Sequence, residues 1–277
     1  MENDKYKNLI EKGVPEQEIN VVKLFNEGAD KPIHIDRINN QRIISISANG
    51  CGIKQIPKNI NVLEKLDYLF INEPKITELP DTIGDLINLK RIDILDSSIL
   101  NLPDSIKNLP YLEVLSVGKN LKNFPIQICA ITSIRTLDLS ENQINSIPDC
   151  LGNLSNLRNL NLNKNEIKTL PDSIYQLRNL RNLSLENNSL KIISNKVENL
   201  ISLNELFLSN NKLEHLPESF EKLKLLTRLK IDNNQFIEFP EALKELNLGY
   251  LDIRGNNIKK LPKKLGRIKL HGDGEYY

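Results

Sequence analysis

Side chains capable of catalysis or metal binding are few in this sequence, and they form no recognised pattern. The three cysteines, Cys51, Cys129 and Cys150, are scattered, and no C-x-x-C pair is present. The sequences G-x-S-x-G and H-E-x-x-H and the phosphate-binding P-loop are absent as well. His34 and His215 have no potential co-ligand at metal-binding spacing, which favours surface or packing roles for them. We therefore expect no catalytic residue, no metal and no cofactor.

The cysteines also bear on the compartment. Cys129 and Cys150 follow the nearest proline at different offsets, so the spacing favours packing as small apolar residues over a disulfide, which stays an alternative. The first residues are polar, without the apolar run of a signal peptide, and no stretch approaches the 18 apolar residues of a membrane span. These features predict a cytoplasmic protein with no membrane span. A secreted protein whose leader has been removed is the alternative.

A repeat organises most of the chain. Residues 134–148 read I-R-T-L-D-L-S-E-N-Q-I-N-S-I-P, and 23 residues later the pattern returns as L-R-N-L-N-L-N-K-N-E-I-K-T-L-P. The shared form is L-x-x-L-x-L-x-x-N-x-L. Ten copies follow one another at intervals of 23 residues, with two intervals of 22, and they open at Ile43, Leu66, Leu89, Leu112, Ile134, Leu157, Leu180, Leu203, Leu226 and Leu248.

This motif resembles that of the leucine-rich-repeat family, and its Leu-Pro-Asp-Ser-Ile form is similar to the 23-residue subgroup of intracellular Ras-associated and bacterial members. The resemblance implies an α/β solenoid, shaped as a horseshoe, with a parallel concave sheet and short helices or 3₁₀ turns on the convex side. It also implies binding of a protein partner, without indicating which one. No catalytic residue is implied, because the family motif contains none.

Each copy predicts one coil with a strand, a turn and a short helical segment. The strand covers x-Leu-x-Leu, and neighbouring strands must be parallel because each is reached by the same crossover. An Asn then stands at the turn, where its amide can satisfy backbone groups; stacked, these residues form a ladder that we expect to be continuous only from Asn120 onward. Cys51, Pro74 and Ser97 occupy the same place in the first three coils, which predicts a less regular N-terminal third.

The ends of the chain depart from the repeat. In residues 1–42 we expect a helix from about Asn3 to Lys12, a second after Pro15, and a hairpin that turns at Asn39-Asn40 into Arg42–Ser47. The predicted division is an N-terminal cap at 1–42, ten repeats at 43–265 and a C-terminal cap or tail at 266–277. A cap is expected because the first coil would otherwise expose its apolar cross-section.

The candidate site is the solvent-facing side of the strands, because the leucines are explained by packing. Side chains at the third and fifth positions of each coil vary from one coil to the next, so a partner can shape them. Exposed aromatic residues in such places are candidate hot spots, although the N-terminal cap could fold over the first of them. The predicted partner-binding residues are Tyr68, Phe70, Arg91, Asp93, Val114, Asp138, Asn161, Glu205, Phe207, Arg228, Lys230, Tyr250 and Asp252.

Charge excludes some partners. With 37 basic and 36 acidic residues the net charge is +1, which predicts no general attraction to nucleic acid or to an acidic membrane. Three arginines align at the second position of successive coils, Arg135, Arg158 and Arg181. We expect acidic neighbours to offset this line, namely Asp138, Glu141 and Glu186, so that it serves solubility.

Three functions are consistent with these features. The favoured one is a monomeric, non-catalytic scaffold that binds a protein partner through the concave surface. The second is a secreted or surface-displayed protein that interacts with a host. The third is an enzyme or an enzyme-regulating subunit, which the absence of catalytic motifs disfavours.

Overall fold

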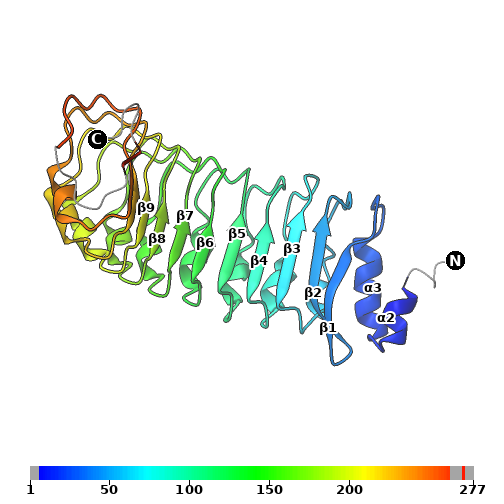
Figure 1. Cartoon of the computed structure of the whole chain (residues 1–277). Coiled ribbons are helices and arrows are strands. Elements are labelled where there is room, and N and C mark those ends of the chain that lie inside the picture. Colours follow the sequence, from blue (N-terminus) through cyan, green and yellow to red (C-terminus); the bar gives the residue numbers. More distant parts are fainter. Residues whose placement is uncertain (1–5, 263–269, 272–277) are drawn as a thin grey trace. The chain divides into compact units, whose positions relative to one another are not determined.

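The computed structural model describes residues 6–262 and 270–271. The chain divides into two compact units, Met1–Leu121 with Ala130–Ile134, and Lys122–Cys129 with Arg135–Tyr277. We call them unit 1 and unit 2 and describe each by itself. In both, each coil up to the one that opens at Leu226 contributes one strand and one short 3₁₀ helix (Figure 1). The α/β leucine-rich-repeat solenoid expected from the repeat is confirmed.

Unit 1 opens with two helices and a hairpin. Helix α2 is Lys7–Glu11 and α3 is Glu16–Phe25; strands β1 (His34–Asn39) and β2 (Arg42–Asn49) pair antiparallel. Helix α3 buries Ile19, Val22 and Phe25. Strand β2 then pairs in parallel with β3 (Tyr68–Asn72), followed in order by β4 (Arg91–Ile94) and β5 (Val114–Val117). The hairpin therefore extends the sheet at its edge.

Unit 2 contains parallel strands in sequence order. Neighbours pair in register, so that Leu160 lies opposite Leu137 on one side and Leu183 on the other. Its strands are β6 (Thr136–Asp138), β7 (Asn159–Asn161), β8 (Asn182–Ser184), β9 (Glu205–Phe207), β10 (Arg228–Lys230), β11 (Tyr250–Asp252) and β12 (Leu270–His271). Most of the predicted C-terminal segment, residues 266–277, lies outside the described residues, and the predicted three-part division of the chain stays a prediction.

The returning half of each coil forms a 3₁₀ helix where the Leu-Pro-x-x-Ile-x-x-Leu motif stands. Proline fixes an extended entry, and an acidic residue in the first turn is favourable beside the free N–H groups. Ser194 stands in for proline in one coil, and its Oγ accepts a hydrogen bond from Lys196 N at 3.2 Å. These helices are η1 (Ile60–Val62), η2 (Asp81–Asp85), η3 (Asp104–Asn108), η4 (Ile126–Ala130), η5 (Asp149–Asn153), η6 (Asp172–Gln176), η7 (Asn195–Asn199), η8 (Glu218–Lys222) and η9 (Glu241–Glu245).

In unit 2 the turn asparagines form the expected ladder. Asn188 is representative: its Nδ2 donates to the carbonyls of Leu162 (2.9 Å) and Leu185 (3.1 Å), and its Oδ1 accepts from Ile167 N at 3.0 Å. Asn165, Asn211 and Asn234 repeat this geometry one coil apart. Each ladder residue thus binds its own coil and the preceding one, and satisfies backbone groups that are buried at the turn.

In unit 1 the same place is filled differently. Pro74 stands at the ladder position, and the buried carboxylate of Glu73 instead accepts hydrogen bonds from the N–H groups of Cys51 and Gly52. Asn120 donates to the carbonyl of Ser97 at 2.5 Å. The less regular N-terminal turns predicted from the sequence are therefore observed, with a carboxylate taking the role of an amide.

Candidate functional site

The solvent-facing side of each strand is defined by the alternation of side chains along it. In every described strand of unit 2 from β6 to β10, the central leucine is buried and the residues on either side of it keep solvent exposure. Alternate side chains of a strand point to opposite faces, so the flanking residues form one common surface. All the predicted site residues lie on strands at these flanking positions.

In unit 1 an arginine draws two predicted residues together. Arg91 Nε lies 2.5 Å from Oδ2 of Asp93, and its guanidinium lies 5.5 Å from the centre of the Tyr68 ring. Asp93 is only 4% exposed, so this carboxylate is largely covered although it stands on the outer face. Removal from water, followed by the nearby Asp93 charge, raises the pKa of Tyr68.

The neighbouring apolar residues of unit 1 remain accessible. Phe70 pairs in register with Asp93, Val114 pairs with Arg91, and both are half-buried. Leu95 is 42% exposed. The N-terminal hairpin lies beside β2 in the sheet, and Tyr68 and Phe70 keep partial exposure. The hairpin therefore does not bury them.

In unit 2 two cations stack on aromatic rings across β9, β10 and β11. The Arg228 guanidinium lies 5.6 Å from the ring centre of Phe207 and 5.8 Å from that of Tyr250, and Lys230 Nζ lies 5.0 Å from Phe207. Arg228 also pairs with Glu205 at 2.9 Å. We call these five residues the aromatic–cation cluster. A cation and the aromatic face beneath it attract each other most strongly when water is excluded. A bound partner would exclude water in this way.

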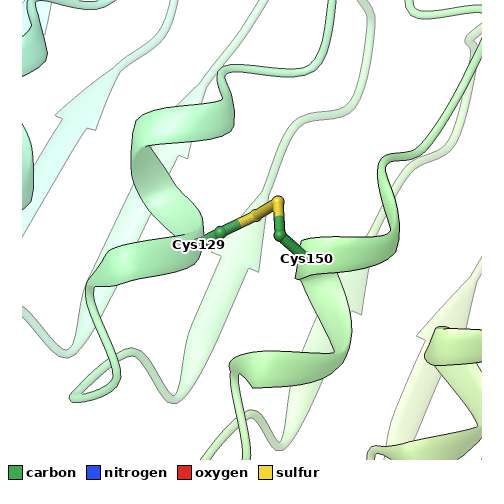
Figure 2. Close-up of a disulfide and its surroundings, with 2 residues drawn as sticks. All are labelled: Cys129 and Cys150. Carbon is green, nitrogen blue, oxygen red and sulfur yellow. A yellow bond between two sulfur atoms is a disulfide. The ribbon is translucent and has the colours of Figure 1, made fainter.

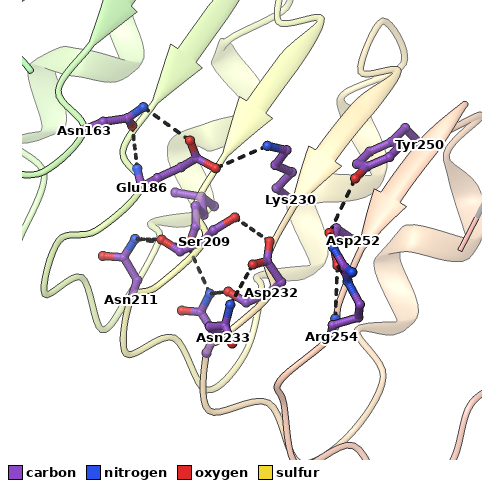
Figure 3. Close-up of polar contacts among 12 residues, drawn as sticks. Asn163, Glu186, Ser209, Asn211, Lys230, Asp232, Asn233, Tyr250, Asp252 and Arg254 are labelled. Carbon is purple, nitrogen blue, oxygen red and sulfur yellow. Dashed lines mark hydrogen bonds and ion pairs between the residues drawn. The ribbon is translucent and has the colours of Figure 1, made fainter. Parts of the chain in front are cut away.

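Polar residues just beyond the strands extend this cluster, as Figure 3 shows. Glu186 forms an ion pair with Lys230 at 3.5 Å, and Ser209 Oγ donates a hydrogen bond to Asp232 at 2.5 Å. Arg254 binds Asp252 through Nε at 2.9 Å and Nη2 at 2.6 Å. Burial opposes ionisation of Asp252, yet hydrogen bonds from Arg254 and its charge hold the pKa of this carboxyl below its usual value.

The sequence prediction missed Glu186, Ser209, Asp232 and Arg254. They occupy the seventh position of their coils, which faces the same side, so the signal was present in the repeat register. Two predicted residues lie elsewhere in unit 2: Asn161 Nδ2 donates to Asp138 at 2.9 Å on β6 and β7, away from the aromatic–cation cluster. The structure thus divides the predicted set into the Tyr68 group, the Asp138–Asn161 pair, the aromatic–cation cluster and Asp252 beside it. The Tyr68 group comprises Tyr68, Phe70, Arg91, Asp93 and Val114.

Cys129 and Cys150 form a disulfide, so the prediction that they only pack was wrong (Figure 2). Cys129 is the fourth residue of η4 and Cys150 the second of η5, and their Cα atoms lie 5.6 Å apart. Adjacent 3₁₀ helices meet on this diagonal elsewhere as well: a Cβ added at Gly152, fourth in η5, would lie 3.0 Å from Cβ of Ser173, second in η6. The two cysteines therefore meet because they stand at different distances in sequence from the preceding proline.

The expectation that acidic neighbours offset the arginine line stays a prediction. Asp138 binds Ser140 and Asn161, Glu141 pairs with Lys164 at 2.5 Å, and Glu186 pairs with Lys230. Each of these acidic residues thus also has a partner outside the line.

Within the described residues, no helix is long and apolar enough to cross a membrane, and no three His, Cys, Asp or Glu side chains are grouped as metal ligands. His34 and His215 are both exposed.

Comparison with known proteins gives the same fold. Residues 123–231 match the family described as a leucine-rich repeat region. A solved leucine-rich-repeat protein of Leptospira interrogans is 31% identical with a TM-score of 0.78, covering 81% of this chain and 59% of its own. No curated protein sequence matches the chain.

Two plant receptors are similar over most of this chain. One is the ectodomain of the Arabidopsis thaliana membrane receptor kinase GASSHO1/SCHENGEN3, solved with CASPARIAN STRIP INTEGRITY FACTOR 2, at 26% identity and a TM-score of 0.66 over 82% of this chain and 30% of the receptor. The other is the peptide hormone receptor RGFR1 with RGF2, at 26% identity and a TM-score of 0.59 over 78% and 38%. The chain therefore spans less than two thirds of each of these three proteins.

Proposed function

Because the chain is a leucine-rich-repeat protein, we propose that it is a non-catalytic scaffold that binds a protein partner through the solvent-facing side of its strands. Leucine-rich-repeat folds generally serve as interaction scaffolds, and the two plant receptors were solved with partner molecules. The site is proposed to be the face that the predicted horseshoe makes concave. A monomer that does not bind nucleic acid is part of the same proposal.

The observation that carries the proposal is the aromatic–cation cluster. Aromatic and arginine side chains dominate the binding energy of protein interfaces. Phe207 and Tyr250 are half-buried, and both flank the exposed Arg228. Rings already held against a cation lose little conformational freedom when a partner covers them. The Tyr68 group of unit 1 supplies a second, smaller area of the same kind.

Capture of partners by the purified chain, measured by quantitative mass spectrometry, tests the proposal. Phe207→Ala with Tyr250→Ala is expected to lower recovery of a specific partner about tenfold or more, since hot-spot truncations cost ~2 kcal/mol each. The matched control is Ile192→Ala with Ile237→Ala, which removes exposed apolar side chains, 64% and 52% accessible, from another surface of unit 2. Partner recovery unaffected by the cluster variant, with both variants melting like the parent, would reject the strand face as the site.

We also propose that the protein functions outside the reducing cytoplasm, in place of the cytoplasmic location predicted from the sequence. The Cys129–Cys150 disulfide supports this location, because disulfides persist mainly in oxidising compartments. Alkylation of the protein from its native cells, after unfolding without reductant, is expected to label only Cys51, the free cysteine. Labelling of all three cysteines would indicate that the protein is located in a reducing compartment.

A further inference from the structure

We propose that unit 2 carries a second docking surface, separate from the strand face, which binds an acidic segment of a protein partner. The surface lies where each 3₁₀ helix leads into its strand. It comprises residues 153–158, 176–181, 199–204 and 222–227, and we call it the pre-strand edge. It is independent of the aromatic–cation cluster, so either surface can be disproved without the other.

Arginines without a partner mark this edge. Arg37, Arg42, Arg91, Arg228 and Arg254 each pair with a carboxylate. Among the described residues, Arg158, Arg178 and Arg181 are exposed and form no ion pair. Unpaired guanidiniums gathered in one place are suited to planar, bidentate binding of carboxylates.

The backbone holds two of these arginines in register. Arg158 N donates to the carbonyl of Arg135 at 2.8 Å, and Arg181 N donates to the carbonyl of Arg158 at 2.8 Å. Parallel strands are spaced about 4.8 Å apart, so the two side chains leave the surface one strand apart. Carboxylates one helical turn apart on a partner, with Cβ atoms roughly 5–6 Å apart, match this spacing.

The four segments of the pre-strand edge contain no acidic residue, whereas the matching segments of unit 1 contain several and that of the last coil contains Glu245. Residues 153–158, 176–181, 199–204 and 222–227 include no Asp or Glu, while Glu64, Asp67, Asp85 and Glu113 stand in the equivalent loops of unit 1. The nearest acidic residue along the strands, Glu205, is engaged by Arg228. The arginines therefore keep a local positive field although the whole chain is nearly neutral.

Two exposed apolar side chains indicate that the anion belongs to a protein. Ile201 and Leu225 lie on the same edge, in the two segments that follow the segment of Arg181, and are 59% and 58% exposed. A sulfated sugar or a phosphate backbone would leave them in water, whereas an acidic segment with apolar residues would cover them. The net charge of +1 also argues against a general polyanion-binding protein.

Fluorescence anisotropy with a short labelled peptide of alternating glutamate and leucine tests the proposal on the full chain. Arg158→Glu with Arg181→Glu is expected to weaken binding about tenfold or more through like-charge repulsion. Lys168→Glu with Lys191→Glu is the matched control, since these exposed lysines lie in the same two coils and change net charge equally. Its effect is expected to stay within about twofold.

A second pair of variants tests the apolar part. Ile201→Ser with Leu225→Ser is expected to weaken the glutamate–leucine peptide about threefold or more, and to leave a glutamate–serine peptide unchanged. If charge reversal unfolds the chain, Arg158→Gln with Arg181→Gln replaces it. Equal losses in the lysine control, no binding of the acidic peptide, or tighter binding of a sulfated oligosaccharide or single-stranded DNA would each overturn the proposal.

Discussion

Unit 1 and unit 2 solve the same turn in different ways. In unit 2 an asparagine ladder crosses the turns, and the residue before each ladder asparagine, from Glu141 to Asn233, adopts a left-handed conformation with φ of 54° to 58°. Strands β6 to β11 each have three residues. In unit 1, where Glu73 replaces the ladder, β2 has eight residues and β3 has five.

The difference shows that pairing of the strands can extend further while the backbone turn stays the same. In unit 1 the pairing of β2 with β3 continues to Asn49 and Asn72, whose side chains are also hydrogen-bonded at 2.8 Å. In unit 2 the left-handed residue donates its own N–H to the next coil, as Lys164 does to Glu186 O at 2.8 Å, and in unit 1 the left-handed Gly50 (φ 59°) donates to Asn72 O at 3.2 Å in the same way. A left-handed non-glycine residue is unfavourable, and the ladder bonds offset that cost.

The largest loss of stability is expected when one ladder asparagine is removed. Asn188→Ala should lower the free energy of unfolding by about 4 kcal/mol. The buried Ile167 N–H loses its acceptor at ~2 kcal/mol, and the carbonyls of Leu162 and Leu185 each lose one of two donors at ~1 kcal/mol. Urea unfolding measures the change. Exposed Asn187→Ala in the same turn is a poor control, since its φ of 58° is itself unfavourable for alanine. Asn179→Ala on the surface is preferable, and a similar loss there would refute the ladder's role.

The Cys129–Cys150 disulfide lies in unit 2, and its removal should have the next largest effect on stability. Cys129→Ser with Cys150→Ser should lower stability by about 3 kcal/mol, because the bond restricts the unfolded chain between residues 21 apart. Thermal unfolding with and without reductant measures this. Reductant should reproduce the loss in the parent and have no further effect on the double variant.

In unit 1 the corresponding change is Glu73→Ala, for which we expect a loss of about 2 kcal/mol. The N–H groups of Cys51 and Gly52 lose their acceptor. The variant no longer buries a charged carboxylate, however, and this offsets part of the lost stability. Urea unfolding compares it with Glu78→Ala, an exposed residue of the same coil. A loss larger than that of Asn188→Ala would reverse the ranking of carboxylate and ladder.

The smallest expected effect is on stability at acidic pH. The folded state holds the pKa of Asp252 below its unfolded value, so Asp252 stabilises the fold above an unfolded pKa of about 3.9. That stability is lost as the pH falls through the lower, folded pKa. Asp252→Asn should therefore flatten the decline in melting temperature below about pH 4. An unchanged decline in this variant would show that other carboxylates are responsible.

Much of the fold was predictable because the repeat encodes it locally. The parallel strands, the 3₁₀ helices after proline and the irregular turns at Cys51 and Pro74 all follow from residues within one coil. The substitution of Glu73 for the ladder was not predictable. It depends on a side chain reaching the backbone of the preceding coil, and the pattern assigns that residue to the surface.

The candidate site was predictable in position but not in grouping. The repeat register places Phe207, Arg228 and Tyr250 on one face, yet only the structure shows the arginine between both rings. The disulfide and the unpaired arginines were missed for a related reason. Both depend on contacts between coils: the diagonal between helices, and the engagement of nearby acids by other partners.

That diagonal has a consequence for the opposite face. An added Cβ at Gly84 would lie 2.3 Å from the backbone oxygen of Ser105, so a glycine there permits a closer approach than any larger residue. The strands are held about 4.8 Å apart by hydrogen bonds, so the thickness of the fourth helical residue sets how far the backs of two coils diverge. Local curvature of the strand face within a unit is therefore adjustable by mutations on the opposite face.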